Sequence, residues 1–193
     1  SGEITVDGAV SAGGAGNVDL NADTITLNAD LAAGGAITGT GASVNVNSGA
    51  EIQDGVEVAA SAATVTIGAG TFQEQIEIAK DLTLQGNGVG STVIEAPDLV
   101  DTKFVRDSKN QKPIVFVTGD ADVTINDLTV DGLGKGNANN GLAGIAFHDA
   151  AGIVDNVHIT RVRDGGTGGA LTGTQHGVGM AAYNEDAAER TVT

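Results

Sequence analysis

A four-residue pattern of alternating polar and apolar residues recurs at a nearly constant spacing at the start of the chain. It occupies residues 3–6 (EITV), 24–27 (TITL), 43–46 (SVNV) and 64–67 (TVTI), which is a period of about 20 residues. Alternation of this kind is typical of a strand with one buried face, and each copy is too short to bury that face alone. The spacing therefore predicts short parallel strands that stack on one another and share a core.

The length of the repeat indicates which kind of stack this is. About 20 residues suffice for three strands of three or four residues and three corners, and glycine pairs at 13–14 and 34–35 suit corners that need a positive φ. The predicted fold class is all-β, a right-handed parallel β-helix, which is a solenoid of about 20–25 residues per coil. The residues expected to point inward include Ile25, Val44, Val65, Leu82, Leu128 and Val157.

The chain divides into two regions that we expect to form one continuous solenoid. Residues 1–63 are rich in Gly, Asn and Ala and contain no Lys, Arg, His or aromatic residue, whereas residues 64–193 carry longer loops, for example at 134–141 and 165–177. In the second region, KDLTLQGNG (80–88) matches NDLTVDGLG (126–134) at five of nine positions. The offset between these two segments predicts two coils of about 23 residues.

Residues 65–96 continue the pattern with short apolar pairs and glycine-rich turns. Residues 70–74 (GTFQE), 76–78 (IEI), 82–88 (LTLQGNG) and 92–94 (TVI) resemble the first coils of pectin-esterase-like proteins, which have the pectin-lyase-like right-handed parallel β-helix fold. Residues 1–63 resemble the Gly/Asn/Ala-rich repeats of filamentous-haemagglutinin-type adhesins. The two resemblances imply a segment of a large bacterial secreted or surface protein, with an extracellular or cell-surface location.

The catalytic motifs of pectin esterases are missing from the sequence. Members of that family carry catalytic aspartates in a Gln-Asp-Thr context and on a strand two coils further on, followed by an Arg-x-x-Trp motif, and this chain has no Trp. Gln73-Glu74 is the only Gln before an acidic residue in the matching region, and it belongs to the turn at 70–74. The resemblance thus implies the fold and leaves the activity open.

Composition narrows the range of partners. The 25 acidic and 9 basic residues give a net charge of −16, which repels phosphate backbones, so nucleic acid is not an expected partner. No apolar run approaches the roughly 20 residues of a membrane span, so membrane insertion is not expected. The absence of Cys excludes disulfides and thiolate metal sites. The many carboxylates suit weak calcium binding, and an acidic coat also serves solubility alone.

One predicted outer face gathers residues with catalytic or metal-binding chemistry. If Leu128 and Val130 point inward, Asp127 and Asp131 point outward, and His158 belongs to the row above them in the next coil. Carboxylates and an imidazole on one face could serve acid–base chemistry on a polysaccharide, and Asp127 and Asp131 could bind calcium. An ordinary outer row of polar residues and ion pairs has the same sequence signature.

Two other groups of polar residues have two interpretations each. Four asparagines of the first region could bond from coil to coil as an amide ladder or could occupy left-handed corners: Asn21, Asn28, Asn45 and Asn47. The stretch at 102–112 (TKFVRDSKNQK) could bind an anion or pair with acidic corners. Its basic residues are Lys103, Arg106, Lys109 and Lys112.

The sequence supports two functional hypotheses. The favoured one is a non-catalytic β-helical segment of an adhesin-like bacterial protein, which serves as a structural stalk or binds a polysaccharide or cell-surface glycan. The alternative is the N-terminal part of a polysaccharide-active enzyme of the pectin esterase or lyase type, because loops lengthen after residue 98 and His, Arg and Asp gather near 145–164. An open strand edge, expected at 191–193 (TVT), also predicts edge-mediated self-association.

Overall fold

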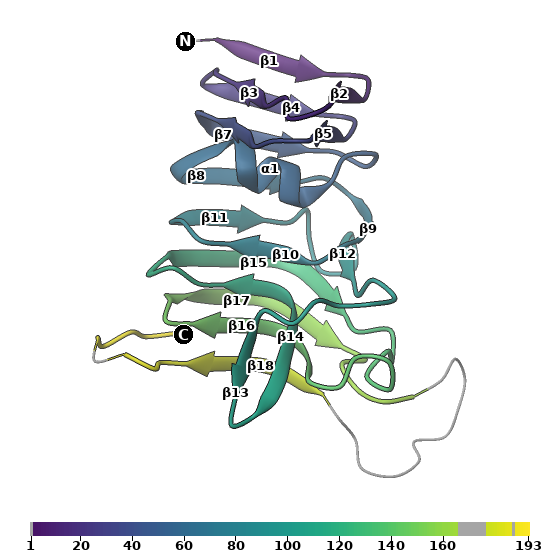
Figure 1. The fold of residues 1–193 in the computed structure, drawn as a ribbon, viewed down its shortest axis with the longest axis vertical. Helices are drawn as coiled ribbons and strands as arrows, with labels where there is room; N and C mark the ends of the chain where they lie inside the picture. Colours follow the sequence, from purple (N-terminus) through teal and green to yellow (C-terminus); the bar gives the residue numbers. More distant parts are fainter. Residues whose placement is uncertain (1, 166–176, 187) are drawn as a thin grey trace.

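The fold is all-β, with mostly parallel strands and very little helix (Figure 1). The computed structural model describes residues 2–165, 177–186 and 188–193, so most of the loop expected at 165–177 lies outside the described residues. In chain order, the elements are β1 (Glu3–Val6), β2 (Val10–Ala12), β3 (Val18–Leu20), β4 (Thr24–Leu27), β5 (Leu31–Ala33), β6 (Ile37–Gly39), β7 (Gly41–Val46), α1 (Ile52–Val58), β8 (Ala59–Ile67), β9 (Gly70–Gln73), β10 (Ile76–Ile78), β11 (Leu82–Gln85), β12 (Thr92–Glu95), β13 (Phe104–Arg106), β14 (Lys109–Val117), β15 (Asp122–Asp131), β16 (Leu142–His148), β17 (Ala151–Thr160) and β18 (Val178–Tyr183).

The largest sheet contains the four-residue pattern that repeats in the sequence. Its strand order is β1-β4-β7-β8-β11-β15-β12-β9, and β17 pairs with β15. Ile4 pairs with Ile25, Ile25 with Val44, and Val44 with Val65, all in parallel. The predicted spacing and parallel pairing of these strands are therefore confirmed.

A row of aliphatic side chains across this sheet forms the centre of the core. The row consists of Ile25, Val44, Val65, Leu84 and Ile125, which are each 0% exposed and lie in register on β4, β7, β8, β11 and β15. Leu82 and Leu128, also expected to point inward, are buried, and Val157 is half-buried against the same core. Burial of such a continuous row is what stabilises strands that are individually too short.

The repeat inferred from the two similar segments at 80–88 and 126–134 is wrong. Leu82 pairs with Val123 and not with Leu128, so the chain returns to its place beside β11 after 41 residues. Strand β15 bends at Asp127, where φ is 54°, and its second half pairs with β12. The two segments resemble each other because each combines a strand with a glycine corner, although the strands lie at different positions in the sheet.

Helix α1 is not expected from the repeat. In the first two repeats a short strand comes next, β2 after β1 and β5 after β4. After β7 the helix α1 takes this place in the chain, and it contacts β6. The side chain of Asp54 on the helix accepts a hydrogen bond from the backbone N–H of Leu31 on β5, at 2.7 Å. Glu74, just after β9, accepts hydrogen bonds from the backbone N–H groups of Ile52 and Gln53 at 2.8 and 2.9 Å, which satisfies the first turn. The helix is thus held by contacts with residues that are distant in the sequence.

Side-chain amides link successive strands along one corner of the stack. Asn28 donates to Asp7 and Asn47 donates to Asn28, each at 2.7 Å. Asn45 donates to a threonine of β4 at 3.3 Å, whereas Asn21 bonds an aspartate close to it in the chain. None of these asparagines has a positive φ. Three of the four asparagines therefore bond the neighbouring repeat as the ladder predicts, and the left-handed-corner interpretation is wrong for all four.

A second sheet, β10-β14-β16-β18, carries the chemically varied part of the chain. Strand β13 adds to β14 in the antiparallel direction, and Asp107 and Ser108 turn between them with φ of 49° and 60°. This β13–β14 hairpin protrudes beside β16 and β18 (Figure 1). At the same end, residues 191–193 bond β17 at Gly152 and Val154. None of the described residues belongs to a helix that could cross a membrane.

Candidate binding site

The structure places the predicted site residues Asp127, Asp131 and His158 on neighbouring strands but in different surroundings. His158 pairs with Thr129, and Thr160 pairs with Asp131, which is the register expected from the sequence. Asp127 is half-buried at the bend of β15, Asp131 is 6% exposed, and His158 is exposed. In the described part of the chain, no hydrogen bond or ion pair joins any two of these three side chains.

Asp131 is the partner of Arg161. The Nε of Arg161 donates to the two carboxylate oxygens at 2.7 and 3.0 Å, its Nη2 also contacts Oδ2, and the backbone N–H of Leu133 donates at 2.9 Å. The hydrogen bonds that Arg161 donates to Asp131 raise the pKa of the guanidinium above its usual range. This fork-like pair fixes the corner after β15 to the next layer of the stack.

Asp127 belongs to a row of amides. Asn156 donates to it at 2.5 Å and Gln85 at 2.8 Å, and these two hydrogen bonds lower the pKa of Asp127. The carboxylates of Asp127 and Asp131 thus already accept bonds from side-chain donors. Among the described residues, no group of three or more His, Asp or Glu side chains could hold a metal ion, and calcium binding at these two aspartates stays a prediction.

The stretch at 102–112 forms the β13–β14 hairpin. Of the two roles predicted for its basic residues, one residue pairs with an acidic corner and two others are placed where an anion could bind. Lys103 pairs with Glu77 at 2.8 Å, as expected for a link to an acidic corner. Arg106 and Lys109 instead stand on either side of the turn and line a pocket. The sequence does not reveal this division because it depends on the antiparallel pairing of Arg106 with Lys109.

An aromatic cluster joins the hairpin to β16 and β18. The ring of Phe104 stacks on Phe116, with 5.5 Å between centroids, and it lies 4.4 Å from the ring of His148 and 5.4 Å from that of Tyr183. His148 and Tyr183 are paired residues of β16 and β18. Aromatic side chains are only 3% of the sequence, and their concentration after residue 103 is the signal that points to this cluster. No sequence pattern indicates that Tyr183 meets His148.

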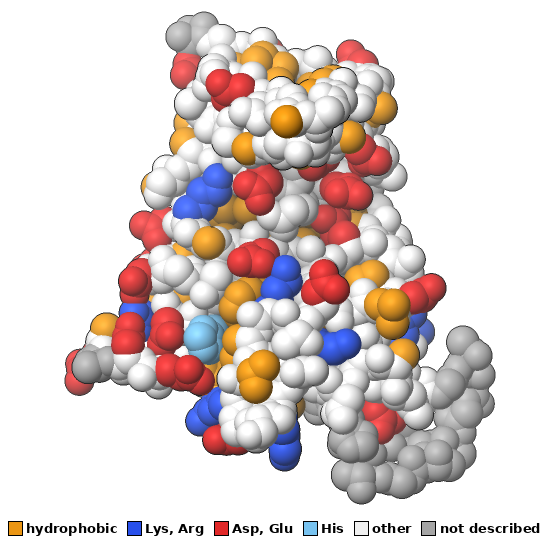
Figure 2. All heavy atoms as spheres, in the orientation of Figure 1, with side chains coloured by type: hydrophobic (Ala, Val, Ile, Leu, Met, Phe, Trp, Pro, Cys, Tyr) orange, Lys and Arg blue, Asp and Glu red, His pale blue; other side chains and the backbone are white. Residues whose placement is uncertain are grey.

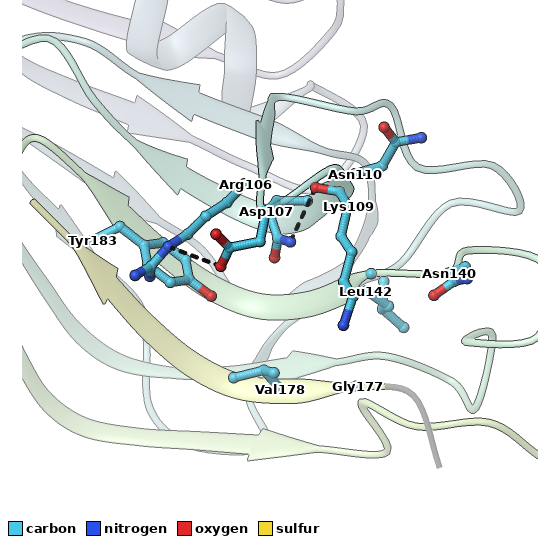
Figure 3. Close-up of a pocket in the computed structure, with 11 residues that line it drawn as sticks. Arg106, Asp107, Lys109, Asn110, Asn140, Leu142, Gly177, Val178 and Tyr183 are labelled. Carbon is cyan, nitrogen blue, oxygen red and sulfur yellow. Dashed lines mark hydrogen bonds and ion pairs between the residues drawn. The ribbon is translucent and has the colours of Figure 1, made fainter. Parts of the chain in front are cut away.

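The pocket opens between this hairpin and β18 (Figure 3). Its volume is about 340 Å³. The guanidinium of Arg106 lies over the ring of Tyr183, 4.4 Å from the centroid, while Lys109 extends toward Leu142 (Figure 3). The other lining residues are Asp107, Asn110, Gln111, Asn140, Gly141, Gly177 and Val178. Amides, cations and a few apolar groups therefore converge on one hollow.

His148 connects the aromatic cluster to acidic residues. Its Nδ1 lies 3.8 Å from Asp149 and its Nε2 lies 3.6 Å from Glu185, and its side chain is 18% exposed. The carboxylate of Asp149 also accepts a hydrogen bond from the backbone N–H of Glu185 at 2.7 Å. An imidazole between two carboxylates is chemically capable of proton transfer, and it also serves to hold residues 184–186 against β16.

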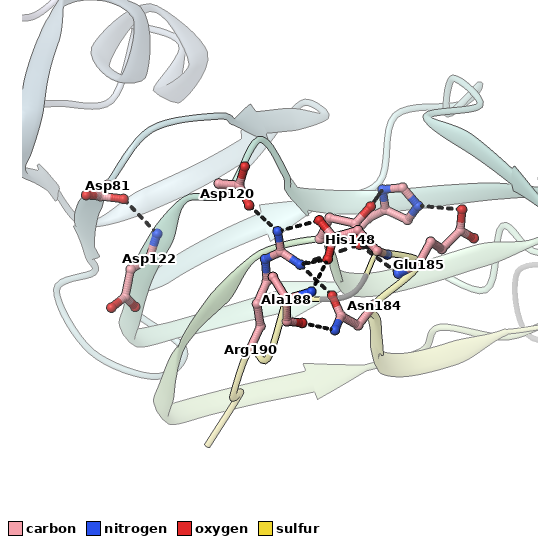
Figure 4. Close-up of polar contacts among 10 residues, drawn as sticks. Asp81, Asp120, Asp122, His148, Asn184, Glu185, Ala188 and Arg190 are labelled. Carbon is pink, nitrogen blue, oxygen red and sulfur yellow. Dashed lines mark hydrogen bonds and ion pairs between the residues drawn. The ribbon is translucent and has the colours of Figure 1, made fainter.

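Arg190 fastens the C-terminal segment to the same region (Figure 4). Its guanidinium contacts Asp120, Asp186 and Asn184, and it lies 3.8 Å from Asp149. The hydrogen bonds that it donates to Asp186 and Asp120 raise the pKa of Arg190, and those from Arg190 and a backbone N–H lower the pKa of Asp186 to about 2. With its cation fully engaged, this cluster is structural.

Two acidic side chains near α1 have raised pKa values. Burial raises the pKa of Glu74 to about 7 and that of Asp54 to about 6, although the hydrogen bonds that they accept from backbone N–H groups act in the opposite direction. Nearby carboxylates raise both values further. Both acids accept hydrogen bonds from backbone N–H groups that tie α1 to distant strands, so we assign them a structural role.

No protein-family model, curated protein or solved structure matches this chain. The resemblances to pectin esterases and to adhesin repeats are therefore not supported by similarity over the chain.

Proposed function

We propose that the chain is a non-catalytic segment of a right-handed parallel β-helix, part of an extracellular or cell-surface adhesin-like protein, which binds a glycan in the pocket beside the β13–β14 hairpin. The pocket is the observation that carries this proposal. Its volume of about 340 Å³ is in the range of small-ligand sites, and it has the size of one or two sugar units.

The parallel registers support the β-helix. The large sheet connects Ile4, Ile25, Val44 and Val65 in one parallel register, and β2–β5 and β3–β6 repeat the same parallel pairing on two further small sheets. Three short strands per repeat are what a three-sided coil requires. The segment that departs from the repeat, between β12 and β15, supplies the hairpin residues on one side of the pocket.

The chemistry of the pocket supports a glycan. Sugars present many hydroxyl groups, which bond to amides and cations, and small apolar faces, which pack on side chains such as Leu142 and Val178. Asn140 is exposed in the pocket, and its amide provides both donors and an acceptor. Loops on a rigid scaffold commonly carry binding residues, and the hairpin fits that pattern.

Affinity electrophoresis tests this proposal. The chain should migrate more slowly in gels that contain one or more of a panel of acidic and neutral polysaccharides. An Asn140→Ala variant should weaken that retardation, and Asn21→Ala, which removes a remote exposed amide, should keep it. A chain that no polysaccharide retards would contradict the proposal.

A carbohydrate-active enzyme is the second candidate, because His148 lies between Asp149 and Glu185 near the pocket. Methylated pectin, polygalacturonate and alginate would be incubated with the chain, and methanol, unsaturated product and reducing ends would be followed. Turnover that His148→Ala abolishes would establish the enzyme. Turnover lost in His158→Ala or Asp131→Ala would place the chemistry on the β15–β17 face instead.

A further inference from the structure

We infer that the pocket selects an acidic sugar, whose carboxylate is bound by Arg106 and Lys109. This inference rests on the proposed glycan-binding function and adds the class of ligand. It follows from three features of the described residues: the distribution of cations, the support of Arg106 by Tyr183, and the amides that complete the pocket.

Cations are scarce on this molecule, and two of them line one pocket. The chain has 9 basic and 25 acidic residues, and Figure 2 shows acidic side chains over much of one face with fewer basic ones between them. Most other cations are engaged: Lys80 with backbone carbonyls, Lys103 with Glu77, Lys135 with Asp98, Arg161 with Asp131 and Arg190 with Asp186. Among the described residues, the amine of Lys109 has no hydrogen-bond or ion-pair partner. The pocket is therefore a local positive site on an acidic body.

Arg106 is oriented for a carboxylate. Its guanidinium carbon lies over the ring of Tyr183, 4.4 Å from the centroid, and this cation–π contact holds the guanidinium at the pocket. The nearest carboxylate to its Nε, that of Asp107, lies at 3.9 Å, beyond hydrogen-bond distance, and is 87% exposed. A planar guanidinium held in this way binds a carboxylate through two parallel hydrogen bonds and loses little side-chain entropy.

The rest of the pocket suits a sugar and not a small anion. Asn140 offers an amide group for hydroxyls, and Leu142 and Val178 offer apolar surface. A volume of about 340 Å³ exceeds what an acetate or phosphate ion fills. The carboxylate would bind beside Arg106, and the ring would lie against Asn140 and Leu142, near the end of the Lys109 side chain (Figure 3).

Matched pairs of sugars test the inference. Methyl glucuronide and methyl glucoside differ only at the carboxylate, and trigalacturonic acid compared with galactotriose repeats the comparison for a uronic acid inside a chain. Their dissociation constants would be measured by NMR titration of the full chain at fixed salt. We expect each acidic sugar to bind at least about tenfold more tightly than its neutral counterpart, as for a charge-assisted pair. Tighter binding of the single unit would indicate a terminal acidic sugar as the ligand, and tighter binding of the trimer would indicate an acidic sugar inside a chain.

Variants at the hairpin separate geometry from net charge. Arg106→Lys keeps the charge but loses the planar fork, so the acidic sugar should bind about tenfold more weakly. Tyr183→Phe keeps the ring and should bind normally, whereas Tyr183→Leu should weaken binding. Asp107→Asn removes a competing carboxylate and should strengthen binding of the acidic sugar only. Lys80→Gln removes one positive charge outside this pocket and should leave binding unchanged, and circular dichroism confirms that each variant folds.

The outcomes separate the inference from the function on which it rests. If acidic and neutral sugars bind equally, or if Arg106→Lys binds like the unmodified chain, selection of the carboxylate is wrong while glycan binding stands. If no sugar of either kind binds, the proposed function is wrong as well. Tighter binding of both acidic sugars, lost in Arg106→Lys, supports both.

Discussion

Glu74 and Asp54 make the stability of this chain depend on pH in an unusual direction. Burial raises their pKa values from 4.5 to about 7 and from 3.8 to about 6, so the folded protein binds protons that the unfolded chain releases. The stability that these two groups contribute is fully present below their unfolded pKa values and is lost as the pH rises through about 6 and 7. Most buried acids that are paired with cations show the opposite dependence.

We predict that the melting temperature falls between pH 5 and pH 8 and that Glu74→Gln reduces this fall. The amide oxygen of Gln can still accept a hydrogen bond from a backbone N–H of α1, but the group no longer titrates. Circular dichroism melts across this pH range measure the slope. Glu3→Gln, at an exposed acid on β1, provides the control for net charge and should keep the slope of the unmodified chain. Equal slopes for all three proteins would contradict the role of Glu74.

The pair between Arg161 and Asp131 yields a second prediction at the same scale. Asp131 is 6% exposed, so Arg161→Leu leaves a buried carboxylate with one backbone hydrogen bond, and the free energy of unfolding should fall by about 2 kcal/mol. Urea denaturation measures this loss. The Arg161→Leu/Asp131→Leu double variant should regain part of it, because no unpaired charge remains. If Arg161→Leu left the free energy of unfolding unchanged, the pair would not be structural.

At the scale of elements, the packing of α1 depends on the absence of a side chain at Gly55. A Cβ atom there would lie 2.3 Å from Cγ2 of Val46 on β7. Gly55→Ala should therefore lower the free energy of unfolding by about 1–3 kcal/mol, as overpacking does in other cores. Val46→Ala makes room, so the double variant should be less destabilised than the sum of the single changes. If the losses in free energy of unfolding of the two single variants simply added in the double variant, contact between position 55 and Val46 would not be the cause.

Elements with a local period could be predicted from the sequence. The strands that contain Ile25, Val44 and Val65 were found because alternating residues recur at a regular spacing, and the inward residues follow from the same period. Helix α1 could not be found in this way, since its first turn is satisfied by Glu74, which lies beyond β8 and β9 in the chain. The error in the longer repeat has a similar origin, because the partner of β11 on β15 is set by the length of the excursion between them.

The candidate site could be predicted only in part. The basic stretch was visible as a cluster of charges, and the register that puts His158 beside Thr129 followed from counting residues. The pocket was not visible, because it needs Arg106 of the hairpin to meet Tyr183, which lies at the end of β18. Contacts between such distant parts of the chain depend on which strands pair, and a local sequence pattern does not specify that pairing.

For the whole molecule, the exposed edges at the ends of the stack predict association between copies. Val178 and Met180 on β18, the edge strand of its sheet, are 45% and 46% exposed, and β1 is an edge strand of the larger sheet at the other end of the molecule (Figure 1). Parallel strands at both ends can pair head to tail, and the net charge of −16 opposes this contact. Sedimentation velocity should show a mass that rises with protein concentration, and more steeply at high salt, where repulsion is screened.

Two variants test where this association occurs. Met180→Lys places a charge at the exposed edge and should reduce the mass at a given concentration. Leu99→Lys, at a 74% exposed loop residue, makes the same change in charge and should have no effect. A single monomeric species at every concentration and salt level would rule out association through the edges.

The strands lie across the long axis of the molecule, as Figure 1 shows, and this has a mechanical consequence. A tensile load applied along that axis pulls the inter-strand hydrogen bonds apart one row after another, instead of shearing many at once. Each released row would lengthen the chain by about 70 Å, at roughly 3.5 Å for each of some 20 residues. The longer passage between β11 and β15 would give a step about twice as long. The extension steps in a pulling experiment would thus report the length of each repeat, and the longest step would identify the segment that contains the hairpin.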